Sequence, residues 1–169
     1  MRPMTQLFVG VLFLGFGTQQ VWASGAAHGI ASSTSDASVL SAAYQLADAV
    51  RTRDVSAFLR LVAREGVPCI DSIVSRQELK KQLRARDTWL GAYFFAPEVF
   101  REKFADLARP ISFAEFLATA RDLRVTTRAT KDERYPCVRF SASNVKSRPY
   151  FCFQRNSDRW VLRELPNCG

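Results

Sequence analysis

The chain has 169 residues, of which 24 are Lys or Arg, 16 are Asp or Glu and 47% are apolar, giving a formal net charge of +8. This composition is typical of a folded globular protein of one domain, and it excludes collagen-like, coiled-coil and low-complexity chains. No run of roughly 20 apolar residues is present, so the sequence predicts no stable membrane anchor.

The first 23 residues have the order of a secretory signal peptide. Arg2 precedes a short apolar run from Leu7 to Phe16, and polar and small residues follow it up to Ala23. A run of about 10 apolar residues is too short to span a bilayer, but it has the length of a signal-peptide core. We therefore expect cleavage after Ala23 and an exported protein, periplasmic or extracellular.

Residues 24–36 are small and polar, and we expect them to form a flexible tail in front of a single domain at residues 37–169. This tail holds His28, the one histidine of the chain. The expected domain therefore lacks the commonest general base and the commonest zinc ligand. No glycine-rich phosphate loop and no nucleophile motif occurs either, so the sequence predicts no cofactor and leans against an enzyme.

The four cysteines are Cys69, Cys137, Cys152 and Cys168. An even number of cysteines in an exported chain favours two disulfides over a zinc site, and no Cys-x-x-Cys pair is present. A hairpin that turns at residues 144–145 would place Cys137 opposite Cys152, which leaves Cys69 for Cys168. A small shift of register would remove this alignment, so the other pairings stay open.

Apolar periodicity predicts a helix from Ser38 to Arg51, followed by a shorter helix that Asp54 caps and Gly66 ends. Residues 66–74 are expected to form a short strand or an extended link. Pro68 restricts such a strand to the edge of a sheet, or itself to the first residues of the strand. Residues 89–95 are rich in aromatic side chains without a clear period. We expect them to form a buried strand or a packed loop.

Three further helix starts have specific signals. Ser75 with Glu78 and Ser112 with Glu115 form capping boxes, in which the serine and the glutamate bond to each other's backbone N–H groups. Pro97 suits the first turn of another helix, and Pro110 would end it.

The last third of the chain has the pattern of an antiparallel meander, with short polar connections between strands. The expected strands run from Leu123 to Thr130, from Tyr135 to Ser143, from Arg148 to Arg155 and from Arg159 to Leu165. Helices followed by strands predict an α+β fold, with a four-stranded sheet packed on the helices. This order resembles nuclear transport factor 2-like (NTF2-like) and cystatin-like folds, a resemblance that implies a curved sheet and no particular site.

Arg76, Lys80 and Arg84 are spaced to form one stripe on a helix. The stripe is the candidate anion-binding or partner-binding face, although such charge runs are usually a solvated helix surface. Arg139, Arg148 and Arg155 could form a basic face of the sheet, or they could pair with nearby acidic side chains.

Asp71, Glu98, Glu102 and Glu115 are the acidic residues closest to apolar neighbours in the sequence. A pair of them could in principle act as acid and base, as in glycosidases. Glu115 already has a capping role, which leaves fewer candidates for such a pair.

Three functions are compatible with these features. The first is an exported, non-enzymatic module, such as an inhibitor, immunity or accessory protein, that binds an acidic protein or an anionic envelope component. The second is a small-molecule-binding or carboxylate-based enzyme with a pocket between sheet and helices. The third is a basic module for anionic polymers, for which one continuous basic patch would be expected and in which nucleic acid is the less favoured ligand.

Overall fold

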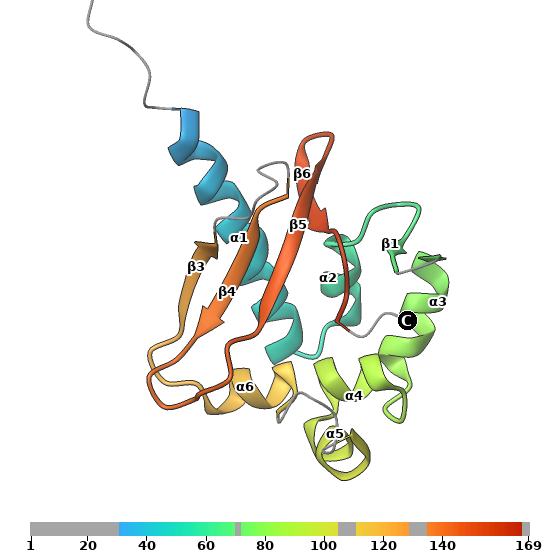
Figure 1. The fold of residues 1–169 in the computed structure, drawn as a ribbon. Helices are drawn as coiled ribbons and strands as arrows, with labels where there is room; N and C mark the ends of the chain where they lie inside the picture. The colour runs from blue at the N-terminus through green and yellow to red at the C-terminus, as the bar shows by residue number, and fades with distance from the viewer. Residues whose placement is uncertain (1–30, 70–71, 105–110, 129–134, 167–169) are drawn as a thin grey trace, which may run out of the picture.

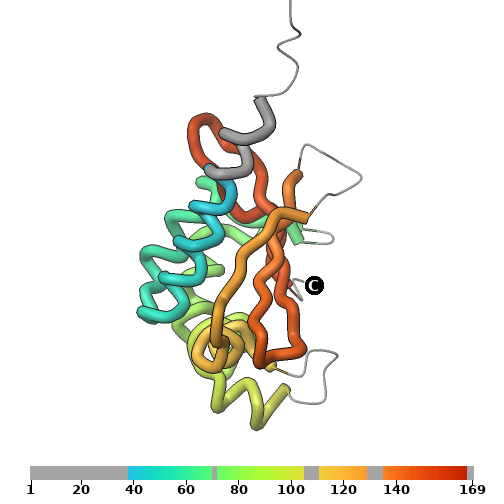
Figure 2. Tube along the Cα trace, turned by 90° about the vertical axis from the view of Figure 1, so that its left-hand side faces the viewer, coloured from blue at the N-terminus to red at the C-terminus, as the bar shows by residue number. Residues whose placement is uncertain are grey.

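The computed structural model describes residues 31–69, 72–104, 111–128 and 135–166, with side chains described from residue 38 onward. Within these residues the fold is α+β, as the sequence predicts. Helices lie on one side of the molecule and the sheet lies on the other, as the side view in Figure 2 shows. The longest helix crosses behind the sheet in Figure 1.

The elements follow one another in the expected order, helices first and strands last. They are α1 (Ala31–Arg51), α2 (Val55–Arg60), β1 (Val67–Pro68), β2 (Ile73–Val74), α3 (Arg76–Arg84), α4 (Trp89–Phe95), α5 (Pro97–Phe104), α6 (Phe113–Thr119), β3 (Arg124–Arg128), β4 (Cys137–Ser141), β5 (Tyr150–Asn156) and β6 (Arg159–Leu162).

The capping signals identify the starts of three helices correctly. The side chain of Asp54 accepts a hydrogen bond from the Ala57 N–H at 2.9 Å, at the start of α2. The hydroxyls of Ser75 and Ser112 accept from the third residue beyond them, at 3.1 and 3.0 Å. These side-chain oxygens bind backbone donors that have no partner inside the helix. Pro97 begins α5 as expected, whereas Pro110 lies outside the described residues.

The expectation of a strand or loop at residues 89–95 is wrong, because these residues form α4. The Thr88 hydroxyl caps the helix by accepting from the Gly91 N–H at 3.1 Å. Every residue from Leu90 to Phe95 is buried. A helix that is covered on all sides shows no amphipathic period, and this explains why the pattern is absent from the sequence.

Three boundaries also differ from the expectation. Helix α1 begins at Ala31, inside the expected tail, because residues 31–37 contain neither Gly nor Pro and a helix nucleated further along extends at little cost. Helix α2 ends at Arg60 and not at Gly66. Gly66 instead precedes β1 with a φ of 122°, and β1 and β2 form a small hairpin where a single short strand or an extended link was expected.

The main sheet is an antiparallel meander of order β3-β4-β5-β6, which confirms the prediction. Strands β4 and β5 pair Cys137 with Cys152, and these two residues form a disulfide. Cys69 is also disulfide-bonded. Cys168 lies outside the described residues, so its pairing with Cys69 stays a prediction.

The core is formed by the inner face of the sheet and the helices that cover it. Helix α1 contacts β3, β4 and β6, and α6 and α4 pack beside it. Phe113 is the centre of an aromatic cluster, with ring centroids 4.8 Å from Phe151, 5.0 Å from Phe140 and 6.2 Å from Phe94. Packed rings of this kind stabilise the fold through buried apolar area and edge-to-face contacts. Phenylalanines therefore build much of the core between the sheet and the helices.

Candidate functional site: the outer face of the sheet

The two faces of the sheet differ in chemistry because successive side chains of a strand point to opposite sides. Val138, Phe140, Phe151 and Phe153 point inward and are at most 2% exposed. Residues between them point outward, away from the helices. The register therefore decides which polar side chains gather on the outer face.

Residues that lie directly opposite each other in an antiparallel pair share one face. Arg139 of β4 pairs with Thr126 of β3 and with Tyr150 of β5, and all three share the face of the Cys137–Cys152 disulfide. Arg124 and Arg128 lie two residues on either side of Thr126, so they point the same way. We call Arg124, Arg128 and Arg139 the open-face arginines.

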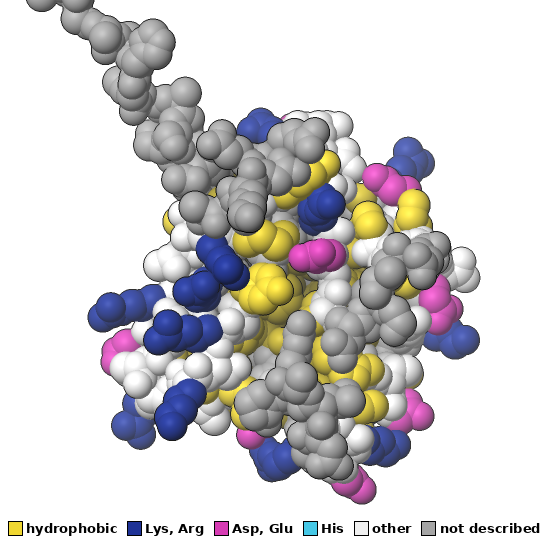
Figure 3. Space-filling view, viewed as in Figure 1, with side chains coloured by type: hydrophobic (Ala, Val, Ile, Leu, Met, Phe, Trp, Pro, Cys, Tyr) yellow, Lys and Arg dark blue, Asp and Glu magenta, His cyan; other side chains and the backbone are white. Residues whose placement is uncertain are grey.

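The open-face arginines share their sheet face with an exposed aromatic ring. Tyr150 is 50% exposed, and the guanidinium carbon of Arg128 lies 5.9 Å from the centre of its ring. This distance is within the range of a cation–π contact. Figure 3 shows the face directly, with Lys and Arg side chains gathered over β3 and β4 beside an apolar area. The site thus offers charge and an aromatic surface together.

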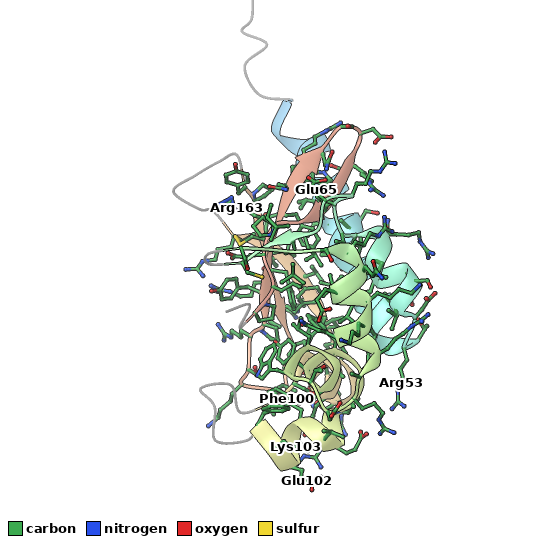
Figure 4. The ribbon with its side chains drawn as sticks, turned by 90° about the vertical axis from the view of Figure 1, so that its right-hand side faces the viewer. Arg53, Glu65, Phe100, Glu102, Lys103 and Arg163 are labelled. Atoms are coloured by element: carbon green, nitrogen blue, oxygen red, sulfur yellow. A yellow bond between two sulfur atoms is a disulfide. The ribbon has the colours of Figure 1, made fainter. Side chains whose placement is uncertain are left out.

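A second arginine–tyrosine pair lies on this side of the sheet, next to the disulfide. Arg163 follows β6, and its backbone N–H donates to the carbonyl of Cys152 at 2.9 Å. Its guanidinium carbon is 3.7 Å from the centre of the Tyr135 ring, a much closer contact than that of Arg128. Figure 4 shows the Arg163 side chain beside the disulfide. This contact and the disulfide fix the backbone at the centre of the face.

The open-face arginines have no acidic partner in the part of the chain that the structure describes. The ion pairs there are Arg86 with Glu98 and Arg101 with Glu115, both among the helices. Unpaired guanidinium groups on one face create a positive potential that attracts anionic partners. A guanidinium without an acidic partner can bind a carboxylate with two parallel hydrogen bonds.

The structure places the three strand arginines that the sequence suggested at different positions and not on one common face. Arg139 lies on the outer face, but Arg155 pairs with Trp160 on the opposite face, and its Nε donates to the carbonyl of Ser157 at 3.4 Å. Arg148 is exposed in the connection between β4 and β5. Arg124 and Arg128 were missed, although their spacing of four residues on an expected strand places both on one face.

The helix stripe Arg76, Lys80 and Arg84 lies on α3 as expected. Leu79 and Leu83 of this helix are buried, so α3 packs on the core and leaves the stripe toward solvent. Lys80 and Arg84 are exposed, and Arg76 is half-buried. Figure 1 places α3 and β3 at opposite margins of the molecule. The stripe and the open-face arginines are therefore two separate basic surfaces.

Three of the four carboxylates considered for an acid–base pair lie in the described residues, and two of these three bind an arginine. Glu98 pairs with Arg86, and a backbone hydrogen bond at Glu98 together with this arginine lowers the pKa of its carboxyl. Glu115 accepts from Arg101 at 2.9 Å. Glu102 is exposed on α5 and points away from the molecule in Figure 4. Asp71 lies outside the described residues.

The described residues contain neither a metal-binding cluster nor a membrane-spanning helix. No group of three or more His, Cys, Asp or Glu side chains in these ranges is arranged to hold a metal ion. None of the helices in the described ranges has the length and apolar character needed to cross a membrane. Comparison with models of known protein families and with curated proteins found no match.

Proposed function

We propose that this protein is an exported, non-enzymatic binding protein whose outer sheet face binds an acidic surface on another protein. The observation that carries the proposal is the set of open-face arginines, Arg124, Arg128 and Arg139, which lack acidic partners among the described residues and share one sheet face with the exposed ring of Tyr150. Arg and Tyr are enriched at protein interfaces because they combine contact area with directed hydrogen bonds.

The disulfide supports both the export and the binding role. Disulfides persist in oxidising compartments, and the Cys137–Cys152 bridge lies within the proposed binding face. A cross-strand bridge limits the motion of β4 and β5, so less conformational freedom is lost when a partner binds. The expected signal peptide adds to this argument. Mass spectrometry of the secreted protein would read Ser24 as the first residue, and an intact Met1 would contradict export with cleavage.

The proposal is tested by comparing two variants that lose the same charge from different faces. The first replaces Arg124, Arg128 and Arg139 by Gln, and the second replaces Arg76, Lys80 and Arg84 by Gln. Binding of fluorescently labelled polyglutamate is measured by anisotropy. Exposed ion pairs contribute about 0.2–1 kcal/mol each, so the loss of three should weaken binding of the first variant by roughly 3-fold to 150-fold. The second variant should bind like the parent.

The matched charge loss makes the outcomes distinct. Equal weakening in both variants would show a response to net charge only and would contradict a site on the sheet. Loss in the α3 variant alone would move the site to the helix stripe. A polyuronate that binds as tightly as polyglutamate would favour the anionic-polymer function over a protein partner. Circular dichroism melting of each variant confirms that the fold is retained.

A further inference from the structure

We propose that the partner binds as an extended acidic strand that adds to the free edge of β3, next to the open-face arginines. This inference rests on the proposed function and specifies the partner's conformation and charge pattern. Strand β3 is at one end of the order β3-β4-β5-β6, and in the described residues no strand pairs with its outer edge. Figure 2 views the molecule from the side of β3, where no described element lies across this strand.

The hydrogen bonds show which backbone groups of β3 remain available. Phe153 N–H donates to Pro136 and Phe140 N–H to Pro149 across β4 and β5, so the even-numbered residues of β4 bond toward β5. The odd-numbered residues, such as Arg139, therefore bond toward β3, where they pair with Arg124, Thr126 and Arg128. Val125 and Thr127 consequently direct their N–H and C=O groups to the free edge.

This arrangement defines the ligand. An added antiparallel strand would form ladder hydrogen bonds with Val125 and Thr127, as in other cases of strand addition. The ligand residues opposite Arg124 and Arg128 would place their side chains on the outer face. In these pairs the two backbones form no hydrogen bond with each other, and the side chains lie closer together. Arg124 and Arg128 are four residues apart. The ligand should therefore carry acidic residues at positions i and i+4 of an extended segment.

A second copy of this chain is a poorer occupant. Two β3 strands related by a two-fold axis at Thr126 would place Arg124 opposite Arg128 of the other copy. Like charges directly opposite each other destabilise a strand pair. The charged ends of β3 thus oppose self-association, which is how natural edge strands avoid aggregation. The same charges favour an acidic strand.

The probe is a peptide of sequence Thr-Glu-Val-Thr-Val-Glu-Thr with blocked ends, and the control peptide carries Lys in place of both Glu residues. Two further peptides carry N-methyl groups, either on the two valine amides or on the two glutamate amides. In the expected register the valine amides face β3 and the glutamate amides face away. Calorimetry should detect binding of the acidic peptide and of its glutamate-methylated form. Methylation of both valine amides removes two hydrogen bonds to β3, so it should weaken binding at least about 5-fold.

A protein variant provides an independent measurement. Thr127→Pro removes an N–H that faces the free edge, so it leaves the β3–β4 hydrogen bonds intact. It should weaken binding of the acidic peptide, because the Thr127 N–H would donate to a carbonyl of the peptide, a hydrogen bond that valine methylation does not remove. The methylated peptides need no protein variant, so they decide the question even if Thr127→Pro fails to fold.

Three results would overturn the inference. If both methylated peptides bind equally, the peptide is held by charge alone, and the proposed acidic-partner function survives without strand addition. If polyglutamate binds at the open-face arginines but the peptide does not bind, strand addition is wrong and the proposed acidic-partner function again survives. If neither acidic probe binds, the inference and the proposed function both fail.

Discussion

Ser75 and Ser112 have the same capping role in different surroundings. The bond of Ser75 to the Glu78 N–H is exposed, whereas Ser112 is fully buried and its bond to the Glu115 N–H is partly buried. When an exposed cap is lost, water can bind the released donor. A buried donor that loses its partner has no such replacement, so its desolvation cost remains.

Ser75→Ala should therefore lower the free energy of unfolding by about 1 kcal/mol, the usual effect of losing a cap. Ser112→Ala should cost more, about 1–3 kcal/mol, because it leaves a backbone donor unsatisfied near the core. Urea denaturation of the two variants measures both values. Equal losses would show that burial of the capping serine does not determine the cost.

At the scale of elements, α4 is the helix that the sequence did not predict, and close packing determines its position. The helix packs so closely on the end of α3 that a Cβ atom at Gly91 would lie 2.0 Å from the carbonyl oxygen of Ala85. The Thr88 hydroxyl completes this junction by donating to the carbonyls of Gln82 and Ala85, at 2.6 and 2.7 Å. Tertiary contacts rather than local pattern hold α4 in place.

Gly91→Ala tests this junction because two effects oppose each other. Alanine favours a helix over glycine by about 1 kcal/mol. Forcing a methyl group against a fixed backbone costs more, about 1–3 kcal/mol or above. The variant should therefore melt at a lower temperature than the parent in calorimetry. A higher melting temperature would show that α4 can move away from Ala85.

The sequence and the structure agree best where local chemistry determines an element. Ser112 with Glu115 predicted the start of α6, and the expected turn at residues 144–145 predicted that Cys137 lies opposite Cys152 in the hairpin. The prediction failed at α4, where burial on all sides removes the period. The open-face arginines were only partly identified, because their grouping depends on how three strands align.

At the scale of the whole molecule, the helices and the inner sheet face form the core, and the outer face is exposed at β3 and at Tyr150. Ser112 is the one buried polar residue among the described side chains. The stripe on α3 and the open-face arginines on β3 and β4 lie outside this core, and Figure 1 places α3 and β3 at opposite margins of the molecule. We propose that the open-face arginines, and not the stripe on α3, contact an acidic partner.

Amide chemical-shift mapping by NMR tests this claim most directly, because it locates the contact without any substitution. Labelled protein is titrated with the acidic peptide at low salt. At higher salt, dissolved ions screen the attraction between exposed charges over about 10 Å, and this weakens binding. We expect the largest chemical-shift changes at residues 124–128, 139 and 150. Changes that are largest on α3, or that spread evenly over all basic surfaces, would contradict it.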